Sequence, residues 1–282
     1  MEVRLADDAR VFLDLAGSLL LADEARNNLL FGIASTVIEN PNRYAEKRFW
    51  VVRDGDEPVA AALRTAPFNL VLATPRDLAV LSALASGIDE ELPGVVGAHP
   101  EVDEFARLWS AGHAVAVRTL REQGVYALEY VQAVSAASGR SRPATKADRG
   151  LLLDWMGAFG AEVLHESDPG RAEDVAMVDQ RLDSNEGGFV VWEDGGAITS
   201  ISGWGGPTPN GIRIGPVYTP PALRGRGYAT ALVAELSQRL LDEGRRCCFL
   251  FTDLANPTSN AIYERIGYVR VAESTMLAFD PL

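Results

Sequence analysis

A short stretch of arginines and glycines, Arg224 to Thr230, has the residue types of an anion-binding turn. It follows an apolar run, Ile212 to Tyr218, that is typical of a strand, and it leads into an amphipathic run, Ala229 to Leu241, that is typical of a helix. Backbone N–H groups at a helix start are free to donate, and the helix dipole adds positive potential there. Glycine lets the backbone approach a ligand closely. The stretch therefore predicts a pyrophosphate cradle.

Two other phosphate-binding motifs do not fit the sequence. A P-loop needs Gly-x-x-x-x-Gly-Lys-Ser/Thr, and the chain contains no such string. A dinucleotide-binding turn needs Gly-x-Gly-x-x-Gly, and the stretch from Arg224 to Thr230 lacks the third glycine.

Residues 142 to 279 resemble the GNAT superfamily of N-acetyltransferases, which bind acetyl-coenzyme A. Its motif Arg/Gln-x-x-Gly-x-Gly/Ala at a helix start stands here as Arg224-Gly225-Arg226-Gly227-Tyr228-Ala229. Its motif Asn-x-x-Ala-x-x-x-Tyr-Glu-x-x-Gly-Phe follows about 30 residues later, with Ser259 in place of Ala and Tyr268 in place of Phe. The matching residues of this second motif are Asn256, Tyr263, Glu264 and Gly267. The amino-acid sequence from Phe251 to Tyr268 most resembles that of the glycine N-acyltransferase-like branch.

The resemblance implies which residues bind the cofactor. The backbone of the strand end would contact the pantetheine arm and the developing oxyanion, and the turn and helix start would hold the pyrophosphate. Asn256 would bond the pantetheine arm or cap the last helix, and Asn260 would contact the cofactor or stay an exposed helix residue. The implied cofactor-binding residues are Val217, Tyr218, Thr219, Arg224, Gly225, Arg226, Gly227, Tyr228, Ala229, Thr230, Asn256 and Asn260.

Tyr263 is the candidate catalytic acid, since the resemblance places its phenol near the leaving sulfur. The reference pKa of tyrosine is about 10 and that of a thiol about 8.5, so full proton transfer is uphill by about 2 kcal/mol. We therefore expect a hydrogen bond that strengthens in the transition state. The alternative is a ring that only packs on the core. The general base stays unassigned among Glu193, Asp253, His165 and Glu166, and no His, Cys or Asp grouping has metal-ligand spacing.

The two halves of the chain repeat one order of elements. Phe49-Trp50-Val51-Val52-Arg53-Asp54-Gly55 matches Phe189 to Gly195 at an offset of 140 residues, and Thr74-Pro75 matches Thr219-Pro220 in place. The first half has no glycine turn after Pro75. We expect a mixed α/β fold of tandem GNAT-like domains, each a central mixed sheet flanked by helices. The N-terminal domain spans 1–137 and is degenerate, and the catalytic domain spans 142–282.

Other patterns predict local elements at particular places. Ala114 to Leu120 with Val125 to Val134 is typical of a closing hairpin, and residues 135–143 are typical of a connector.

Composition bounds the partners and the compartment. The chain has 282 residues and a net charge of −13, which disfavours nucleic-acid binding. That acidity suits solubility, with a cationic substrate as the alternative. The first residues lack the pattern of a signal peptide, so we expect none, and no apolar run reaches the roughly 20 residues that span a membrane. Cys247 and Cys248 are neighbours on a strand and are expected to be thiols of a cytoplasmic protein. A homodimer is left open.

We expect an acetyl-CoA-dependent N-acetyltransferase acting on a small-molecule amine, with no metal. Two alternatives are open at this point. One is a coenzyme A-binding sensor or interaction module without turnover, and the other is an acyltransferase that uses a longer acyl donor.

Overall fold

The structure is a computed structural model that describes residues 1–73, 77–164 and 172–282. The chain forms two compact units. Unit 1 comprises Met1–Tyr126, Phe251–Pro257 and Arg270–Leu282, and unit 2 comprises Ala127–Leu250 and Thr258–Val269. No helix in the described residues is long and apolar enough to cross a membrane. Cys247 and Cys248 are not joined by a disulfide, as expected.

The strands of unit 1 lie in the order β1-β2-β3-β4-β5-β12-β6. Only β4 and β5 among the registered neighbours run parallel, and the chain passes between them through a helix. The strands are β1 (Glu2–Leu5), β2 (Lys47–Asp54), β3 (Glu57–Thr65), β4 (Leu70–Ala73), β5 (Gly94–Ala98), β6 (Val115–Leu128) and β12 (Val269–Pro281). The helices are α1 (Ala9–Ala22), α2 (Asn28–Glu39), α3 (Val80–Gly87) and α4 (Glu101–Gly112).

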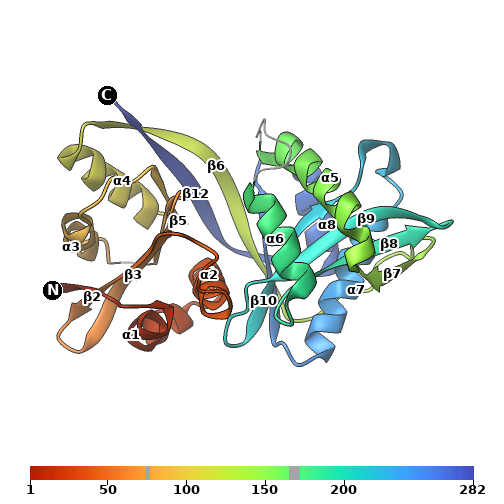
Figure 1. The fold of residues 1–282 in the computed structure, drawn as a ribbon, viewed down its shortest axis with the longest axis horizontal. Helices are drawn as coiled ribbons and strands as arrows, with labels where there is room; N and C mark the ends of the chain where they lie inside the picture. Colours follow the sequence, from red (N-terminus) through yellow and green to blue (C-terminus); the bar gives the residue numbers. More distant parts are fainter. Residues whose placement is uncertain (74–76, 165–171) are drawn as a thin grey trace. The chain divides into compact units, whose positions relative to one another are not determined.

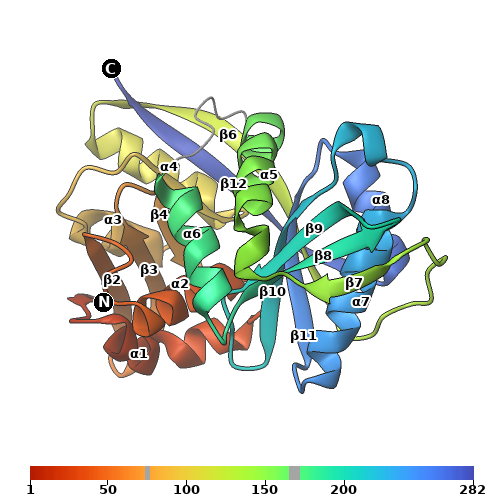
Figure 2. The same cartoon turned by 45° about the vertical axis from the view of Figure 1, so that its right-hand side comes forward.

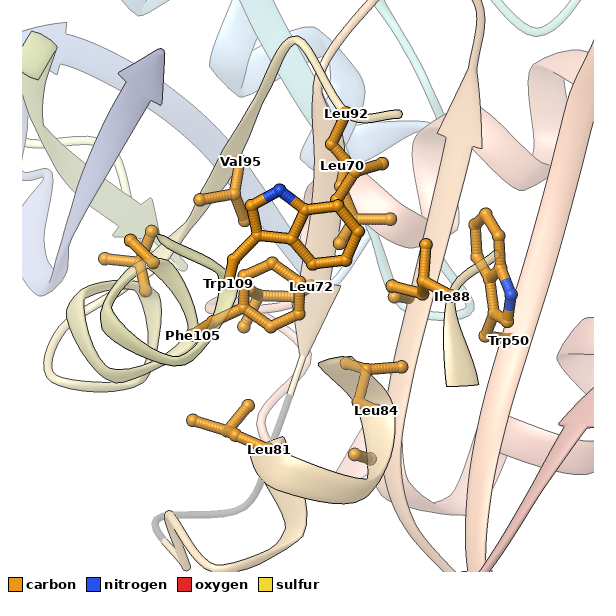
Figure 3. Packing of buried hydrophobic residues seen from close by; sticks show 14 of the residues in the cluster. Trp50, Leu70, Leu72, Leu81, Leu84, Ile88, Leu92, Val95, Phe105 and Trp109 are labelled. Carbon is orange, nitrogen blue, oxygen red and sulfur yellow. The ribbon is translucent and has the colours of Figure 1, made fainter. Parts of the chain in front are cut away.

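Helices cover both faces of this sheet. Successive residues of a strand point to opposite sides, so each strand buries side chains on both faces. Phe49 and Val51 face α1 and α2, whereas Trp50 and Val52 face α3 and α4. Trp109 of α4 is 1% exposed and lies over the second face, with its ring centroid 5.9 Å from that of Phe105. Figure 3 shows its indole among the leucines and valines of β4, β5 and α3.

The last strand of the chain belongs to unit 1. β12 pairs antiparallel with β5, with Met276 opposite Val96, and Figure 1 shows it beside β5 and β6. The C-terminal segment therefore completes the sheet formed by the N-terminal part of the chain. The boundaries 1–137 and 142–282, as limits of two GNAT-like domains, stay a prediction.

One local prediction from the sequence is wrong, and a second is wrong in part. In place of the hairpin expected from Ala114 to Leu120 with Val125 to Val134, there is one strand, β6 (Val115–Leu128), and residues 129–134 form no strand. The expected connector 135–143 is irregular over residues 135–139, as predicted, but Arg140–Pro143 form the strand β7, which pairs with β8, with Arg140 opposite Glu193.

Unit 2 repeats the element order of β1 to β5. Its strands lie in the order β11-β10-β9-β8-β7, and β10 and β11 are the parallel pair. The strands after β7 are β8 (Gly188–Asp194), β9 (Ala197–Gly205), β10 (Gly211–Tyr218) and β11 (Cys247–Asp253). The helices are α5 (Arg149–Phe159), continued by a π-helical turn (Gly160–Leu164), α6 (Ala172–Asp183), α7 (Tyr228–Asp242) and α8 (Pro257–Ile266).

The two faces of this second sheet carry different helices. Phe189, Val191 and Ile201 pack against α5 and α6. The side chains between them face α7, and the Arg239 guanidinium of α7 lies 5.8 Å from the ring centroid of Trp204. Figure 2 shows α5 and α6 on one side of β8 to β10.

Asp148 joins β7 and β8 to the start of α5. Its carboxylate accepts two hydrogen bonds from Arg142, at 2.8 and 2.9 Å, and one from the backbone N–H of Thr145 at 2.7 Å. Arg142 also donates to Glu193 on β8 at 2.8 Å. The Arg142 hydrogen bonds, with those of Thr145, lower the pKa of Asp148 to about 2.

Asp148→Asn is expected to destabilise the protein by about 2 kcal/mol at pH 7, because the folded-state pKa lies below the unfolded value of about 3.9. The contribution is complete above pH 4 and is lost as the pH falls through the folded pKa. Denaturant unfolding from pH 7 to pH 3 measures it. Asp179→Asn, on the exposed pair with Arg149, is the control and should change little. A difference between wild type and Asp148→Asn that stays constant with pH would contradict the assignment.

Candidate active site

Strand β10 leaves its parallel partner halfway along its length. Only Gly211, Ile212 and Arg213 pair with β11, whereas the pairing with β9 continues to Tyr218. The register with β9 shifts between Ile214 and Val217, which marks a bulge. Successive N–H groups of a strand point to opposite edges, so the second half of β10 presents backbone donors on the side that β11 has left. Val217 and Tyr218, predicted from the sequence to bind the cofactor, lie in this part.

Side chains hold the end of β10 in place. The Ser200 hydroxyl donates to the carbonyl of Tyr218 at 3.2 Å and lies 2.9 Å from the hydroxyl of Thr219. The Nε of Arg224 donates to the carbonyl of Thr219 at 2.8 Å. These contacts fix the backbone just before the glycine turn.

The glycine turn presents free backbone donors at the start of α7. Gly225 and Gly227 have φ angles of +76° and +84°, which side-chain-bearing residues rarely adopt. The first intrahelical bond runs from Ala231 to Gly227, and no side chain caps the helix. The N–H groups of residues 228–230 therefore have no helical acceptor. A Cβ at Gly225 would meet nothing within 4 Å, so the surface over the turn is open. The turn fits the predicted pyrophosphate cradle.

The two arginines of the turn do different things. Arg224 forms an ion pair with Glu162, with Nη1 2.6 Å from Oε1, so its guanidinium anchors the turn to the π-helical segment after α5. Arg226 is exposed and makes no ion pair within residues 1–73, 77–164 and 172–282. Arg226 is therefore the turn arginine whose charge is available to an anion.

The Tyr228 side chain is also engaged. Its hydroxyl donates to Asp194 at 2.5 Å, and Ser138 donates to the same carboxylate at 2.7 Å. These hydrogen bonds, Tyr228 first, hold the pKa of Asp194 below its usual value. The Tyr228 phenol is thus directed to the β8–β9 turn, and only its backbone N–H faces the cradle.

Tyr263 lies on α8 and is partly exposed. Its ring packs edge-on against Tyr268, with centroids 6.0 Å apart, and Tyr268 shares a 2.9 Å hydrogen bond with Ser237 of α7. Burial raises the pKa of Tyr263 to about 12. Within the described part of the chain its hydroxyl makes no hydrogen bond. Tyr263 is therefore a neutral phenol with its proton available.

The remaining predicted residues are placed less directly. Asn260 lies on α8 in unit 2, and Asn256 precedes that helix in the part of the chain assigned to unit 1. Among the base candidates, Glu193 pairs with Arg142, and Asp253 accepts the backbone N–H of Ala255 at 2.7 Å. His165 and Glu166 lie outside the described residues.

Arg181 of α6 is a residue that the sequence patterns did not indicate. Its Nη1 donates to the carbonyl of Gly215, inside the β10 bulge, at 2.8 Å, and its guanidinium lies 5.4 Å from the ring centroid of Phe189. Burial, with the charge of Arg213 second, lowers the pKa of Arg181 to about 9. The signal that could have found it is the recurrence of glycine on one face of β9, which leaves room for a long side chain.

Unit 1 contains the same parting of parallel strands. β4 pairs with β5 only at Leu70–Val95 and Val71–Val96. The hollow beyond is lined by an ion pair between Arg26 and the buried Glu101, and by apolar side chains. In this unit, charged side chains thus occupy the place beside the parted strands. Thr74 and Pro75, which were matched to the start of the glycine turn, lie outside the described residues.

Residues 153–268 match the model of the Acetyltransferase (GNAT) family. No curated protein matches the sequence. The glycine N-acyltransferase-like branch stays a prediction.

Solved structures share the fold over the whole chain. A Drosophila protein has a TM-score of 0.70 at 14% identity and covers 99% of this chain and 98% of its own. A GCN5-related N-acetyltransferase from Sphaerobacter thermophilus has a TM-score of 0.60 at 19% identity, covering 98% and 94%. A tandem GNAT protein from the clavulanic acid biosynthesis pathway has a TM-score of 0.57 at 14% identity, covering 99% and 98%. The prediction of a mixed α/β fold with tandem GNAT-like character is confirmed.

Gly203→Ala is expected to displace Arg181, because the new Cβ would lie 2.3 Å from Nη1. Loss of the bond to Gly215 should cost about 1–2 kcal/mol of unfolding free energy. Urea unfolding in a double-mutant cycle measures it: in an Arg181→Ala background the same change should cost less than half as much. Gly150→Ala, at a helix position with open space, is the control. Equal costs in both backgrounds would contradict the contact.

Proposed function

We propose that the chain is an acetyl-CoA-dependent N-acetyltransferase that acts on a small-molecule amine in unit 2. The observation that carries this proposal is the bulged strand β10, which parts from β11 after Arg213 and leads directly into the uncapped glycine turn of α7. A parted strand beside an anion cradle suits a ligand with an acyl thioester at one end and phosphates at the other. The GNAT family match over residues 153–268 supports the same reading.

The residues of unit 2 suit each part of acetyl-CoA. The N–H groups of residues 228–230 and the charge of Arg226 suit the pyrophosphate. Because neighbouring N–H groups point to opposite edges, one of Val217 and Tyr218 donates on the open side of β10, and that donor suits the pantetheine arm or the thioester carbonyl. Acetyl-CoA supplies the activated acetyl group, and no metal is needed in this scheme.

Acetyl transfer changes two bonds and moves one proton. The neutral amine forms a C–N bond to the thioester carbon, the C–S bond breaks, and one proton leaves the nitrogen as one reaches the sulfur. A backbone N–H of β10 that donates to the carbonyl oxygen stabilises the charge that develops there. One such donor contributes about 3 kcal/mol to an acyl-transfer transition state.

Tyr263 is proposed to donate a hydrogen bond to the leaving sulfur. With a pKa of about 12, full proton transfer to a thiolate of pKa about 8.5 would be uphill by about 5 kcal/mol in an unchanged environment. The raised pKa therefore favours a hydrogen bond that strengthens as the C–S bond breaks. The engagement of Glu193 with Arg142 leaves the general base to a bound water or to a residue not yet assigned.

Release of free thiol from acetyl-CoA with a panel of small amines tests the proposal. Turnover with acetyl-CoA, and weaker turnover with longer acyl-CoAs, is the expected result. Binding of acetyl-CoA without turnover on any amine would favour the coenzyme A-binding module. A preference for longer acyl chains would favour the other acyltransferase.

Gly227→Val is expected to abolish acetyl-CoA binding, because a β-branched residue at a φ of +84° strains the turn that aims the helix donors. Isothermal titration calorimetry should show one site per wild-type chain and none in the variant. Gly244→Val is the matched control, since Gly244 also has a positive φ, of +102°, but follows the other end of α7. That variant should lose stability and keep binding. Two sites per wild-type chain would overturn the asymmetry between the units.

Tyr263→Phe is expected to lower kcat by about 10- to 100-fold, the loss of one transition-state hydrogen bond. The affinity for acetyl-CoA should stay unchanged. Steady-state kinetics and calorimetry on the same preparation measure both quantities. Tyr268→Phe is the control, since its hydroxyl bonds Ser237 and should affect stability alone. An unchanged kcat in Tyr263→Phe would remove Tyr263 from the mechanism.

A further inference from the structure

The peptide between Tyr218 and Thr219, at the end of β10, is held by a buried serine of β9. Tyr218 stands opposite Ile201 in the register of the two strands, so the next residue along each strand brings Ser200 beside Thr219. Ser200 is 0% exposed, and its hydroxyl donates to the Tyr218 carbonyl at 3.2 Å. This carbonyl therefore points toward β9.

The direction of this carbonyl sets the direction of the next N–H group. The bond between Tyr218 and Thr219 is trans, and the C=O and N–H of a trans peptide point in opposite directions. The N–H of Thr219 thus points away from β9, to the edge that β11 has left after Arg213. Alternate N–H groups of a strand point the same way, so Val217, and not Tyr218, presents the second donor on this edge.

A second hydroxyl orients the first. The hydroxyl oxygens of Ser200 and Thr219 lie 2.9 Å apart. A serine hydroxyl has one proton, and Ser200 gives that proton to the Tyr218 carbonyl, so the Thr219 hydroxyl is the donor to Ser200. Hydrogen bonds in such a series polarise one another. The series therefore holds one peptide plane from both sides of the bond.

The neighbouring serine of β9 shows that burial alone does not produce this contact. Ser202 lies on the same face of the strand as Ser200 and is also 0% exposed. Its hydroxyl donates at 3.3 Å to the carbonyl of Gly203, the next residue of its own strand. Of these two serines, Ser200 is the one whose hydroxyl bonds β10.

We propose that Ser200 is a positioning residue for acetyl transfer, because its hydrogen bond sets the peptide plane from which β10 donates to acetyl-CoA. The proposal rests on the proposed acetyltransferase function and adds a residue that acts through the backbone of β10. The phosphates bind at the turn that follows Thr219, so the thioester lies toward Val217. The N–H of Val217 then donates to the thioester carbonyl oxygen, and that of Thr219 to a carbonyl of the pantetheine arm.

Ser200→Ala tests this role in kinetics and binding. A misaimed backbone donor costs more in the transition state, where charge develops on the carbonyl oxygen, than in the bound thioester. The kcat for acetyl transfer should therefore fall about tenfold. The Kd of acetyl-CoA depends largely on the cradle and should change less than about threefold. Steady-state kinetics and calorimetry measure the two quantities.

Ser202→Ala is the matched control, since it removes an equally buried hydroxyl from the same face of the same strand. It should lower the melting temperature about as much as Ser200→Ala does, and it should leave kcat within about twofold of wild type. An unchanged kcat in Ser200→Ala, or an equal fall in both variants, overturns the positioning role.

Thr219→Val tests the order of the two hydroxyls. It keeps the shape of the side chain and removes the donor to Ser200, so kcat should fall about threefold. In a Ser200→Ala background the same change should have almost no effect on kcat, because no hydroxyl is left to orient. Effects that multiply in the double variant overturn the series.

Hydrogen exchange resolved to single amides separates this proposal from the function on which it rests. If acetyl-CoA binds, it should slow exchange at Val217 and Thr219 in wild type. Ser200→Ala should lose most of this protection and keep that of residues 228–230. Equal protection in wild type and Ser200→Ala overturns the role of Ser200, whether or not an amine is turned over.

If acetyl-CoA does not bind, the proposed function fails, and exchange in the free protein decides the role of Ser200. The Tyr218 amide faces β9 and should exchange at least about tenfold more slowly than those of Val217 and Thr219. A difference that disappears in Ser200→Ala and persists in Ser202→Ala supports the positioning of this peptide. The same exchange pattern in wild type and Ser200→Ala overturns it.

Discussion

The second sheet depends on one constraint, that β10 must separate from β11 while it stays bonded to β9. A strand that stops pairing with its neighbour exposes backbone N–H and C=O groups, and these groups need other hydrogen-bond partners. The bulge between Ile214 and Val217 turns the strand, and specific side chains donate hydrogen bonds to its carbonyls. Arg181 donates to the carbonyl of Gly215 and Ser200 donates to that of Tyr218. Arg224 donates to the carbonyl of Thr219. The backbone donors on the open edge remain for a ligand.

The two units share one order of strands and helices but differ in what lies beside the parted parallel strands. Each has an antiparallel run of strands, a crossover helix and a parallel strand that soon parts from its neighbour. Beside the parted strands of unit 1 stands the buried Arg26–Glu101 ion pair, whereas unit 2 leads into an open glycine turn. A buried, paired charge fixes structure, and an open donor array binds anions. This difference places the proposed chemistry in unit 2.

The arginines around the proposed site have different roles, which depend on whether a carboxylate pairs with them. Arg142 and Arg224 have carboxylate partners and hold elements together. Arg226 and Arg181 lack such partners in the described residues, one at the cradle and one at the bulge. Net charge governs the average surface, but recognition follows the local arrangement of charges.

The sequence by itself determined what depends on neighbouring residues. Short apolar runs predicted strands such as β2, β8 and β10, and the Arg-Gly-Arg-Gly turn predicted a helix start with free backbone donors, because these preferences are local. The tertiary structure alone decided that β6 is one strand, that β12 completes the sheet of unit 1, and that Arg181 reaches the bulge of β10. These features depend on contacts between residues tens to hundreds of positions apart, and no local pattern encodes which distant segment will supply the partner.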